Sequence, residues 1–515
     1  MRSPTRAPAA VTAPDLRRPR QALMLGAMLF LLPLPARPDA LPLPVSQALR
    51  QAGIPLSGVG IYVHEIDASE PLLAVNAGAP MNPASVMKLI TTFAGLELLG
   101  PAHTWKTEIY ADGTLDGDTL RGDLVMKGYG DPKLNLENFW LLTRRLRQTG
   151  LREVTGDLVL DTRHFSLPGG GPGDFDGKPH RAYNVLPEPL LVNHGALALR
   201  LTPQLTERTV RVAVDPLLPS LDLRNDLALT HGPCNTWSDT LAPDIRTLAE
   251  GGLRASITLR GDYSADCGEK TLYFRVYDTQ DYVFGLFKQL WEEQGGQLRG
   301  SARSGMAPDG VTPLVIHRSP PLADIVRDIN KFSNNTAARQ LYLALGAASH
   351  PEAGTGARPA GPCNACAMAA GGEAPPATLA ASEQALRRWL ASRQLSFPGF
   401  VVENGSGLSR NERISPEHLG MLLRLAFQSR VMPEFISSLP IAAVDGTMKK
   451  RLADSAVAGQ AHVKTGSLSG VKTMAGYVLE RSGRRAVVVF LVNHPRADAA
   501  QAAMDALLRW VCDRS

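Results

Sequence analysis

Three short clusters of polar residues, far apart along the chain, constrain its fold more than any other feature. They are Ser85-Val86-Met87-Lys88, Ser333-Asn334-Asn335 and Lys464-Thr465-Gly466. Together they supply the hydroxyl, amine and amide groups with which a serine can act as a nucleophile without histidine. If they form one site, the two ends of the chain fold together, and much of the 248-position interval between Ser85 and Ser333 is an insertion.

The first cluster has the context of a nucleophile at the start of a helix. Pro83 stands in the first turn of the predicted helix, and apolar residues follow at helical spacing. Lys88, one turn after Ser85, can accept the serine proton if burial and cationic neighbours lower its pKa. The same spacing recurs at Ser469 and Lys472, but that pair lies between predicted strands, where the two side chains would point to opposite faces.

Each cluster also has an ordinary structural interpretation. Ser85 and Asn335 are both suitable helix caps, and Lys464 is a reasonable solvated strand residue. His462 is a candidate for a Ser–His pair, but no His lies near Ser85 in the sequence and no G-x-S-x-G elbow surrounds that serine. The joint order of the three clusters favours one catalytic site over these alternatives.

Residues 1–36 are predicted to be an export signal. An apolar run at residues 22–34 follows an Arg-rich start, and the small residues Ala36 and Ala40 come next. The run is shorter than the roughly twenty residues that a membrane-spanning helix needs. A buried N-terminal helix and an uncleaved anchor are the alternatives. We therefore expect an exported protein.

The chain after this segment is close to neutral. The predicted signal contains five Arg and one Asp, which accounts for +4 of the formal net charge of +5 and leaves +1. This balance does not point to nucleic acid as a partner. The later sequence also contains no Gly-rich phosphate loop and no Lys/Arg block. No cofactor is predicted.

The five cysteines fit an exported protein. Cys234 and Cys267 lie in one polar region and are candidates for a disulfide. Cys363 and Cys366 form a tight pair in an Ala/Gly/Pro-rich loop, but a zinc site needs four ligands and no second pair lies nearby. Cys512 is left over, and we expect it to be buried against the last helix. No metal site is predicted.

The two ends of the chain have the patterns of one antiparallel sheet with helices against it. Residues 59–65 and 72–75 predict a hairpin before the first cluster. Two further strands, 474–480 and 486–492, are predicted after the third cluster. Residues 498–512 have apolar side chains at helical spacing and predict a final helix.

The stretch between the first two clusters predicts a β-rich insertion. Turn-forming residues separate its short alternating runs, which lie at residues 107–110, 124–126, 156–160, 197–201, 210–214 and 255–259. We therefore expect a catalytic domain formed by residues 41–104 and 313–515, and one or two inserted β-rich domains at residues 105–312.

With these features the chain resembles the D-alanyl-D-alanine carboxypeptidase/endopeptidase family, the class C low-molecular-mass penicillin-binding proteins, which are exported peptidoglycan enzymes. Clusters of the three kinds found here are typical of penicillin-binding proteins and β-lactamases. The resemblance extends over nearly the whole chain after the predicted signal, including the large insertion. Four further motifs contribute to it: Gly128-Tyr129-Gly130-Asp131-Pro132, Asn330-Lys331, Gly405-Ser406-Gly407-Leu408-Ser409-Arg410 and Val444-Asp445-Gly446-Thr447.

The resemblance implies an α+β fold of the penicillin-binding-protein/β-lactamase type, in which an antiparallel sheet is flanked by helices and carries β-rich inserted domains. It implies a periplasmic serine D-alanyl-D-alanine carboxypeptidase and endopeptidase that acts on peptidoglycan stem peptides and crosslinks. β-Lactam antibiotics would be covalent inhibitors, and loose membrane association would be compatible with this function. The alternatives are a β-lactamase-like hydrolase and a non-catalytic peptidoglycan-binding scaffold.

The resemblance also implies a role for each residue of the first two clusters. Ser85 would be acylated by the penultimate D-Ala carbonyl, and Lys88 would accept the serine proton. Ser333 would relay a proton to the leaving amine, while Asn335 would hold the substrate amide and Lys88.

The third cluster is implied to bind and polarise the substrate. Lys464 would add positive charge beside the base and, with Thr465, bind the terminal carboxylate of the substrate. Gly466 would let the strand approach the ligand without an intervening side chain. The backbone N–H groups of Ser85 and Ser467 would form the oxyanion hole.

This chain departs from the family's usual pattern in three ways, one of which is that the loop with Cys363 and Cys366 is longer than the pattern requires. Asn404 stands where Asp is usual before Gly-Ser-Gly, and Ser467 stands where Thr is commoner. Both residues keep hydrogen-bonding capacity, so we expect changed tuning rather than lost activity. Phe175, Asp176 and Tyr183 lie where the family places contacts with the side chains of the stem peptide.

Overall fold

The computed structural model describes residues 41–234, 237–238, 240–248, 254–348 and 375–515. The predicted export signal and the Cys363–Cys366 pair lie outside these described residues.

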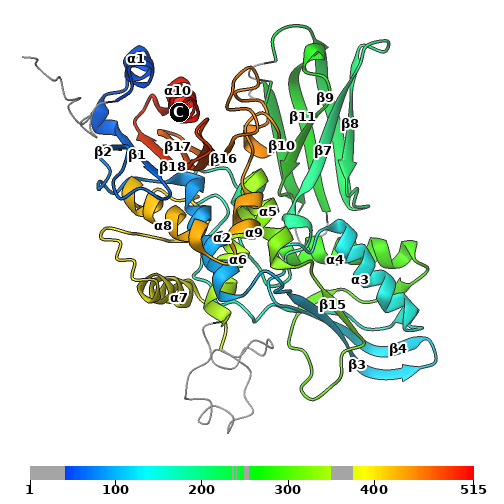
Figure 1. Cartoon of the computed structure of the whole chain (residues 1–515). Coiled ribbons are helices and arrows are strands. Elements are labelled where there is room, and N and C mark those ends of the chain that lie inside the picture. The colour runs from blue at the N-terminus through cyan, green and yellow to red at the C-terminus, as the bar shows by residue number, and fades with distance from the viewer. Residues whose placement is uncertain (1–40, 235–236, 239, 249–253, 349–374) are drawn as a thin grey trace, which may run out of the picture. The chain divides into compact units, whose positions relative to one another are not determined.

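A five-stranded antiparallel sheet joins the two ends of the described chain, in the order β16-β17-β18-β1-β2 (Figure 1). In this sheet Val59 lies opposite Val492, and Val471 lies opposite Asn493. The strands are β1 (Val59–Glu65), β2 (Leu73–Val75), β16 (Ala461–Leu468), β17 (Val471–Leu479) and β18 (Arg485–Asn493). The predicted hairpin and the two strands predicted after the third cluster are confirmed.

The central strand β18 is apolar on both faces because helices cover both faces. Alternate side chains beginning at Ala486 pack with α1 (Leu43–Ala52) and α10 (Gln501–Cys512). The side chains between them, beginning at Val487, belong to the core that contains α8 (Pro416–Gln428). Two-sided burial explains why this strand is a continuous apolar run and does not alternate. An antiparallel sheet flanked by helices, as the α+β prediction requires, is therefore present.

Helices on the second face of the sheet carry the first two clusters. They are α2 (Lys88–Leu98), α5 (Leu322–Phe332), α6 (Asn335–Ala348), α7 (Leu379–Ser392) and α9 (Met432–Ser438). Helix α5 ends where Ser333 takes a left-handed conformation with φ of 58°. Helix α6 begins two residues later, and the Asn334 side chain accepts a hydrogen bond of 3.0 Å from the Ala337 N–H. This sharp junction places Ser333 and Asn335 side by side.

The described residues between the first two clusters form three sheets. One joins β13 (Gln297–Leu298), β5 (Glu153–Val154), β4 (Thr119–Gly128), β3 (Lys106–Asp116) and β15 (Val315–Arg318). In the same sheet β6 (Leu158–Asp161) pairs with β4, and β14 (Ala302–Ser304) pairs with β6. The other two are β10 (Leu241–Leu248)-β11 (Arg254–Ser264)-β9 (Leu221–Thr230) and β12 (Lys270–Phe274)-β7 (Leu197–Gln204)-β8 (Thr209–Asp215). Each alternating run identified in the sequence coincides with one of these strands.

Two helices in this stretch were not predicted. They are α3 (Leu136–Gln148) and α4 (Thr279–Glu293), and both contribute to a core that extends from Ile109 to Val315. Strand β15 follows residue 312, the predicted end of the inserted domains, yet it pairs with β3, which lies inside them. The division of the chain into domains stays a prediction.

The cysteine predictions that fall on described residues are confirmed. Cys234 and Cys267 form a disulfide. Cys512 is a buried free thiol on the last helix, α10.

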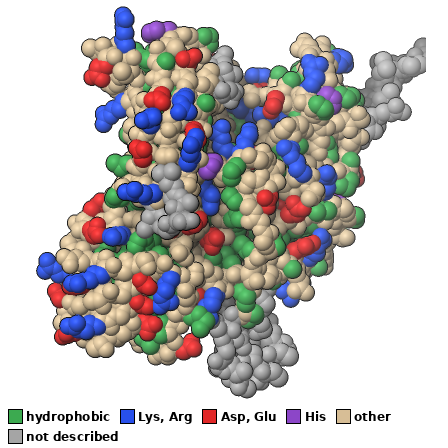
Figure 2. Space-filling view, turned by 180° about the vertical axis from the view of Figure 1, so that it is seen from behind, with side chains coloured by type: hydrophobic (Ala, Val, Ile, Leu, Met, Phe, Trp, Pro, Cys, Tyr) green, Lys and Arg blue, Asp and Glu red, His purple; other side chains and the backbone are tan. Residues whose placement is uncertain are grey.

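Two surface properties bear on the predicted partners. No helix in the described ranges is both long and apolar enough to cross a membrane. On the face seen in Figure 2, Lys and Arg side chains are interspersed with Asp and Glu side chains, in keeping with the near-neutral charge after the predicted signal.

Candidate active site

Ser85 lies in a tight turn that leads directly into α2. The turn is a 3₁₀ helix, η2 (Ala84–Met87), and Ala84 enters it with a φ of 45°, a conformation that costs a non-glycine residue free energy. The Asn82 side chain supports this turn by accepting a hydrogen bond of 2.9 Å from the Ala84 N–H. Ser85 is half-buried, whereas Lys88 at the start of α2 is fully buried.

The amine of Lys88 is held by three acceptors. Its Nζ donates to Ser85 Oγ at 2.9 Å and to Asn335 Oδ1 at 2.7 Å. It also donates to the backbone carbonyl of Ser406. Residues from the first two clusters therefore meet at one amine, although 247 positions separate Lys88 from Asn335. The Lys88 Nζ lies within proton-transfer distance of the Ser85 hydroxyl.

The third cluster joins these catalytic candidates through a contact between Lys464 and Ser333. Lys464 is fully buried, and its Nζ donates to Ser333 Oγ at 2.8 Å and to its neighbouring carbonyl, that of Thr465, at 2.6 Å. The Thr465 hydroxyl donates to the hydroxyl of Thr447 at 2.8 Å. The structure thus brings the three predicted clusters together.

Burial lowers the pKa values of both lysines, and neighbouring positive charges add to the shift of Lys88. Burial lowers the pKa of Lys88 well below its ordinary value, and the positive charges of Lys464 and Arg339 lower it further. Burial lowers the pKa of Lys464 to about 7. Arg339 has a pKa lowered to about 10 by burial, so it stays charged at neutral pH. These shifts favour a neutral amine on Lys88, the form that can accept a proton.

Gly466 brings the edge strand β16 against the nucleophile turn. A Cβ atom on Gly466 would lie 2.3 Å from Thr473 Oγ1 and 2.8 Å from the backbone nitrogen of Ser85. Thr473 in turn donates a hydrogen bond of 2.8 Å to the Pro83 carbonyl. Besides the approach of a ligand, for which the resemblance implies this glycine, packing within the protein itself requires it.

Replacing Gly466 by Ala should therefore displace the Ser85 turn. We expect the rate at which Ser85 is acylated to fall by about 100-fold or more, because displacement of a reacting group by about 1 Å has this effect. Acylation kinetics with a serine-directed reagent, compared with the melting temperature, will measure it. A variant that is equally stable and equally fast would contradict this explanation of Gly466.

A loop of the stretch between the first two clusters reaches this group. The Asn335 side-chain amide donates to the Tyr183 carbonyl at 3.4 Å. The Tyr183 hydroxyl donates to Asp176 at 2.8 Å, and the Arg410 guanidinium lies 5.1 Å from the centre of the Phe175 ring. Of the three residues that the resemblance associates with substrate side chains, Tyr183 therefore contacts a catalytic cluster directly, Asp176 contacts Tyr183, and Phe175 lies beside Arg410.

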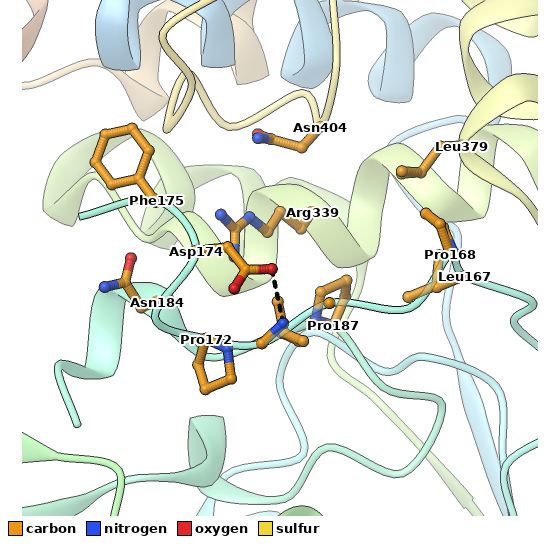
Figure 3. Close-up of a pocket in the computed structure, with 13 residues that line it drawn as sticks. Leu167, Pro168, Pro172, Asp174, Phe175, Asn184, Pro187, Arg339, Leu379 and Asn404 are labelled. Atoms are coloured by element: carbon orange, nitrogen blue, oxygen red, sulfur yellow. Dashed lines mark hydrogen bonds between the residues drawn. The ribbon is translucent and has the colours of Figure 1, made fainter. Parts of the chain in front are cut away.

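A pocket of about 220 Å³ opens between this loop and α6 (Figure 3). Its apolar wall includes Pro168, Pro172, Phe175, Pro187 and Leu379, and its polar wall includes Asp174, Arg339 and Asn404. The Arg339 guanidinium donates to the Val185 carbonyl at 3.1 Å, so helix α6 also helps to hold the loop. The pocket thus borders the same helix that contributes Asn335.

Sequence reasoning missed one charged residue of the site. Glu412 is fully buried, and it acts electrostatically on both Lys88 and Arg339. A Glu in a polar segment ordinarily faces solvent, so the pattern gave no signal of its burial. Asn404, the expected departure, uses its side chain within its own turn, where it accepts from Ser406 and donates to Leu408.

The described residues contain no group of three or more His, Cys, Asp or Glu side chains arranged to hold a metal ion. The side chains brought together at the candidate site are those of two serines, two buried lysines and an amide.

Comparison with known proteins places these features in a family. Residues 43–358 and 365–512 match the model of the D-Ala-D-Ala carboxypeptidase 3 (S13) family. A D-alanyl-D-alanine carboxypeptidase of Actinomadura sp. (strain R39) is 28% identical over 467 residues, which cover 87% of this chain and 80% of that protein. The D-alanyl-D-alanine carboxypeptidase DacB of Haemophilus influenzae is 23% identical over 442 residues, which cover 85% of each.

Solved structures agree on the fold. The crystal structure of penicillin binding protein 4 from Haemophilus influenzae superposes with a TM-score of 0.70 at 21% sequence identity. The match covers 90% of this chain and 99% of that one. The same protein in complex with a β-lactam superposes with a TM-score of 0.67.

Proposed function

This chain belongs to the D-Ala-D-Ala carboxypeptidase 3 (S13) family, and we propose that Ser85 is the nucleophile with which it cleaves D-alanyl-D-alanine peptides. The observation that carries this proposal is the contact of the fully buried Lys88 amine with Ser85 Oγ at 2.9 Å. A serine hydroxyl needs a base at hydrogen-bond distance, and a buried lysine beside other cations can be that base.

The proposed reaction begins when neutral Lys88 takes the proton of Ser85 as Oγ attacks the carbonyl carbon of the penultimate D-Ala. The backbone N–H groups of Ser85 and Ser467 stabilise the oxyanion that forms. The C–N bond then breaks, and Ser333, which contacts Lys464 at 2.8 Å, relays a proton to the departing amine of the terminal D-Ala. Water hydrolyses the resulting ester and frees Ser85.

Lys464 and Thr465 are proposed to bind the terminal carboxylate of the substrate. With its pKa lowered to about 7, Lys464 is only partly protonated in the empty site at neutral pH. A carboxylate beside it favours the protonated form. Substrate binding would therefore place a full positive charge near Lys88 just when Lys88 must be neutral. Asn335 would hold the substrate amide while keeping its contact with Lys88.

We further propose that the substrates are the stem peptides of peptidoglycan and their crosslinks, reached after export to the periplasm. The loop that carries Phe175, Asp176 and Tyr183 adjoins Asn335 and Arg410, which supports a contact between this loop and the side chains of a stem peptide. A crosslink differs from a free D-Ala-D-Ala end only in the leaving group beyond the scissile bond, so the same acyl-enzyme would serve both reactions.

The test is incubation of the protein lacking residues 1–36 with a fluorescent penicillin, followed by peptide mapping, together with D-alanine release from a pentapeptide. We expect one stable adduct, on Ser85, and D-alanine release that pre-incubation with penicillin blocks. An adduct on another residue would contradict the assignment of the nucleophile. An adduct that disappears within seconds would indicate a β-lactamase, and binding to peptidoglycan with no adduct would indicate a scaffold.

A further inference from the structure

A buried carboxylate beside the catalytic lysines has no part in the mechanism above. Glu412 is fully buried, and its Oε1 accepts hydrogen bonds of 3.1 Å from the backbone N–H groups of both Glu403 and Asn404. Its Oε2 has no hydrogen-bond partner within the described part of the chain. Burying a carboxylate costs substantial free energy, so an electrostatic reason for its presence is expected.

We propose that the negative charge of Glu412 sets the pH at which Lys88 becomes a neutral base, and that its carboxylate holds the turn that contacts Lys88. Glu412 is thus a positioning residue that acts through Lys88. This inference rests on the proposed function, because it presupposes that Lys88 accepts the proton of Ser85.

The turn between Asn404 and Glu412 connects this carboxylate to the nucleophile. Its Ser406 carbonyl accepts a hydrogen bond from Lys88. A Cβ atom on Gly407 would lie 1.9 Å from the Ala84 carbonyl, so the turn packs directly on the residue before Ser85. The Glu412 carboxylate binds the backbone at the entrance of the turn and fixes it from the opposite side.

Burial is the largest influence on Glu412 and raises its pKa above the ordinary value, while neighbouring groups act in both directions. Burial and the nearby Glu403 raise its pKa, whereas two backbone N–H groups and Lys88 favour the charged carboxylate. Helix α6 contributes the charged Arg339 and the buried Tyr342 hydroxyl on this side. The two backbone N–H donors lie 3.1 Å from Oε1 and stabilise the carboxylate form.

The sign of the effect on Lys88 follows from these charges. Lys464 and Arg339 lower the pKa of Lys88, and Glu412 opposes them by raising it. Because Lys88 must be neutral to act as a base, the rate of acylation falls with acidity as Lys88 takes up a proton. Removing the negative charge of Glu412 lowers the pKa of Lys88 further, so this acid limb moves to lower pH.

The experiment measures the rate constant for acylation by fluorescent penicillin between pH 4.5 and pH 9 in two matched pairs of proteins. Wild type and Glu412→Gln share a side-chain length and differ in charge. Glu412→Asp and Glu412→Asn repeat the comparison with a shorter side chain, and they provide the test if Glu412→Gln does not fold. We expect each neutral variant to have its acid limb about one pH unit below that of its charged partner, as loss of a nearby opposite charge predicts.

Coincident acid limbs within both pairs would overturn the electrostatic role of Glu412. A limb that moves equally in Glu412→Asp and Glu412→Asn would also overturn it, because the shift would then depend on side-chain length. Failure of the proposed function gives a different result, since wild-type protein would then show no adduct on Ser85 or no acid limb.

Discussion

Replacing Ser85 by Ala should remove both covalent penicillin labelling and D-alanine release. The substitution deletes only Oγ, the atom that contacts Lys88 at 2.9 Å, and leaves the apolar packing of the turn unchanged. Loss of the nucleophile in a serine hydrolase lowers turnover on the order of 10⁴-fold or more. In-gel fluorescence of the adduct and a D-alanine release assay will measure the two activities.

The chain provides its own control in the second serine–lysine pair. Ser469 and Lys472 repeat the spacing of the first cluster, but Ser469 lies in the turn between β16 and β17. There its backbone carbonyl accepts a hydrogen bond from Arg410. Ser469→Ala should therefore label like wild type. Wild-type labelling of Ser85→Ala, or loss of labelling in Ser469→Ala, would show that the nucleophile is assigned to the wrong serine.

These two serines show what sequence alone could predict. Helical spacing after Ser85 and strand patterns around Ser469 distinguished identical motifs, and the structure places them in a turn before α2 and in a turn between strands. The strands at the two ends were predicted for the same reason, because each strand leaves a local signal in the sequence. The order of the clusters then indicated which segments must meet. Lys88 does contact Ser85 and Asn335, and Lys464 contacts Ser333.

The parts that were missed depend on contacts that a local pattern does not record. Helix α3 has buried Phe139, Leu142 and Leu146 on one face, a helical signal that the many short strands around it obscured. Glu412 and Asn411 are consecutive polar residues, yet only Glu412 is buried, because the backbone of residues 403–404 folds over it. Such burial is set by the way this turn folds back on itself, which the period of a helix or a strand does not record.

Replacing Lys88 by Arg should separate two roles of this side chain, that of a proton acceptor and that of a positive charge. Arginine can still donate to Asn335 and to the Ser406 carbonyl, the two acceptors that position the amine. It keeps its proton at any pH used for assay, so it cannot accept that of Ser85. We expect the rate of acylation by penicillin to fall about 1,000-fold, the range of general-base catalysis. Stopped-flow or gel-based labelling kinetics will measure the decrease.

Lys464→Arg is the matched control, because the proposed role of Lys464 is to provide positive charge to the substrate carboxylate. Arginine retains that charge, so we expect a loss of at most about tenfold. Both lysines are fully buried, and both variants therefore introduce the same larger side chain into a packed site. Equal losses in the two variants would mean that side-chain size dominates, and a smaller loss for Lys88→Arg would transfer the role of base to Lys464, whose pKa of about 7 also permits it. A large loss confined to Lys88→Arg would identify Lys88 as the group that takes the proton of Ser85.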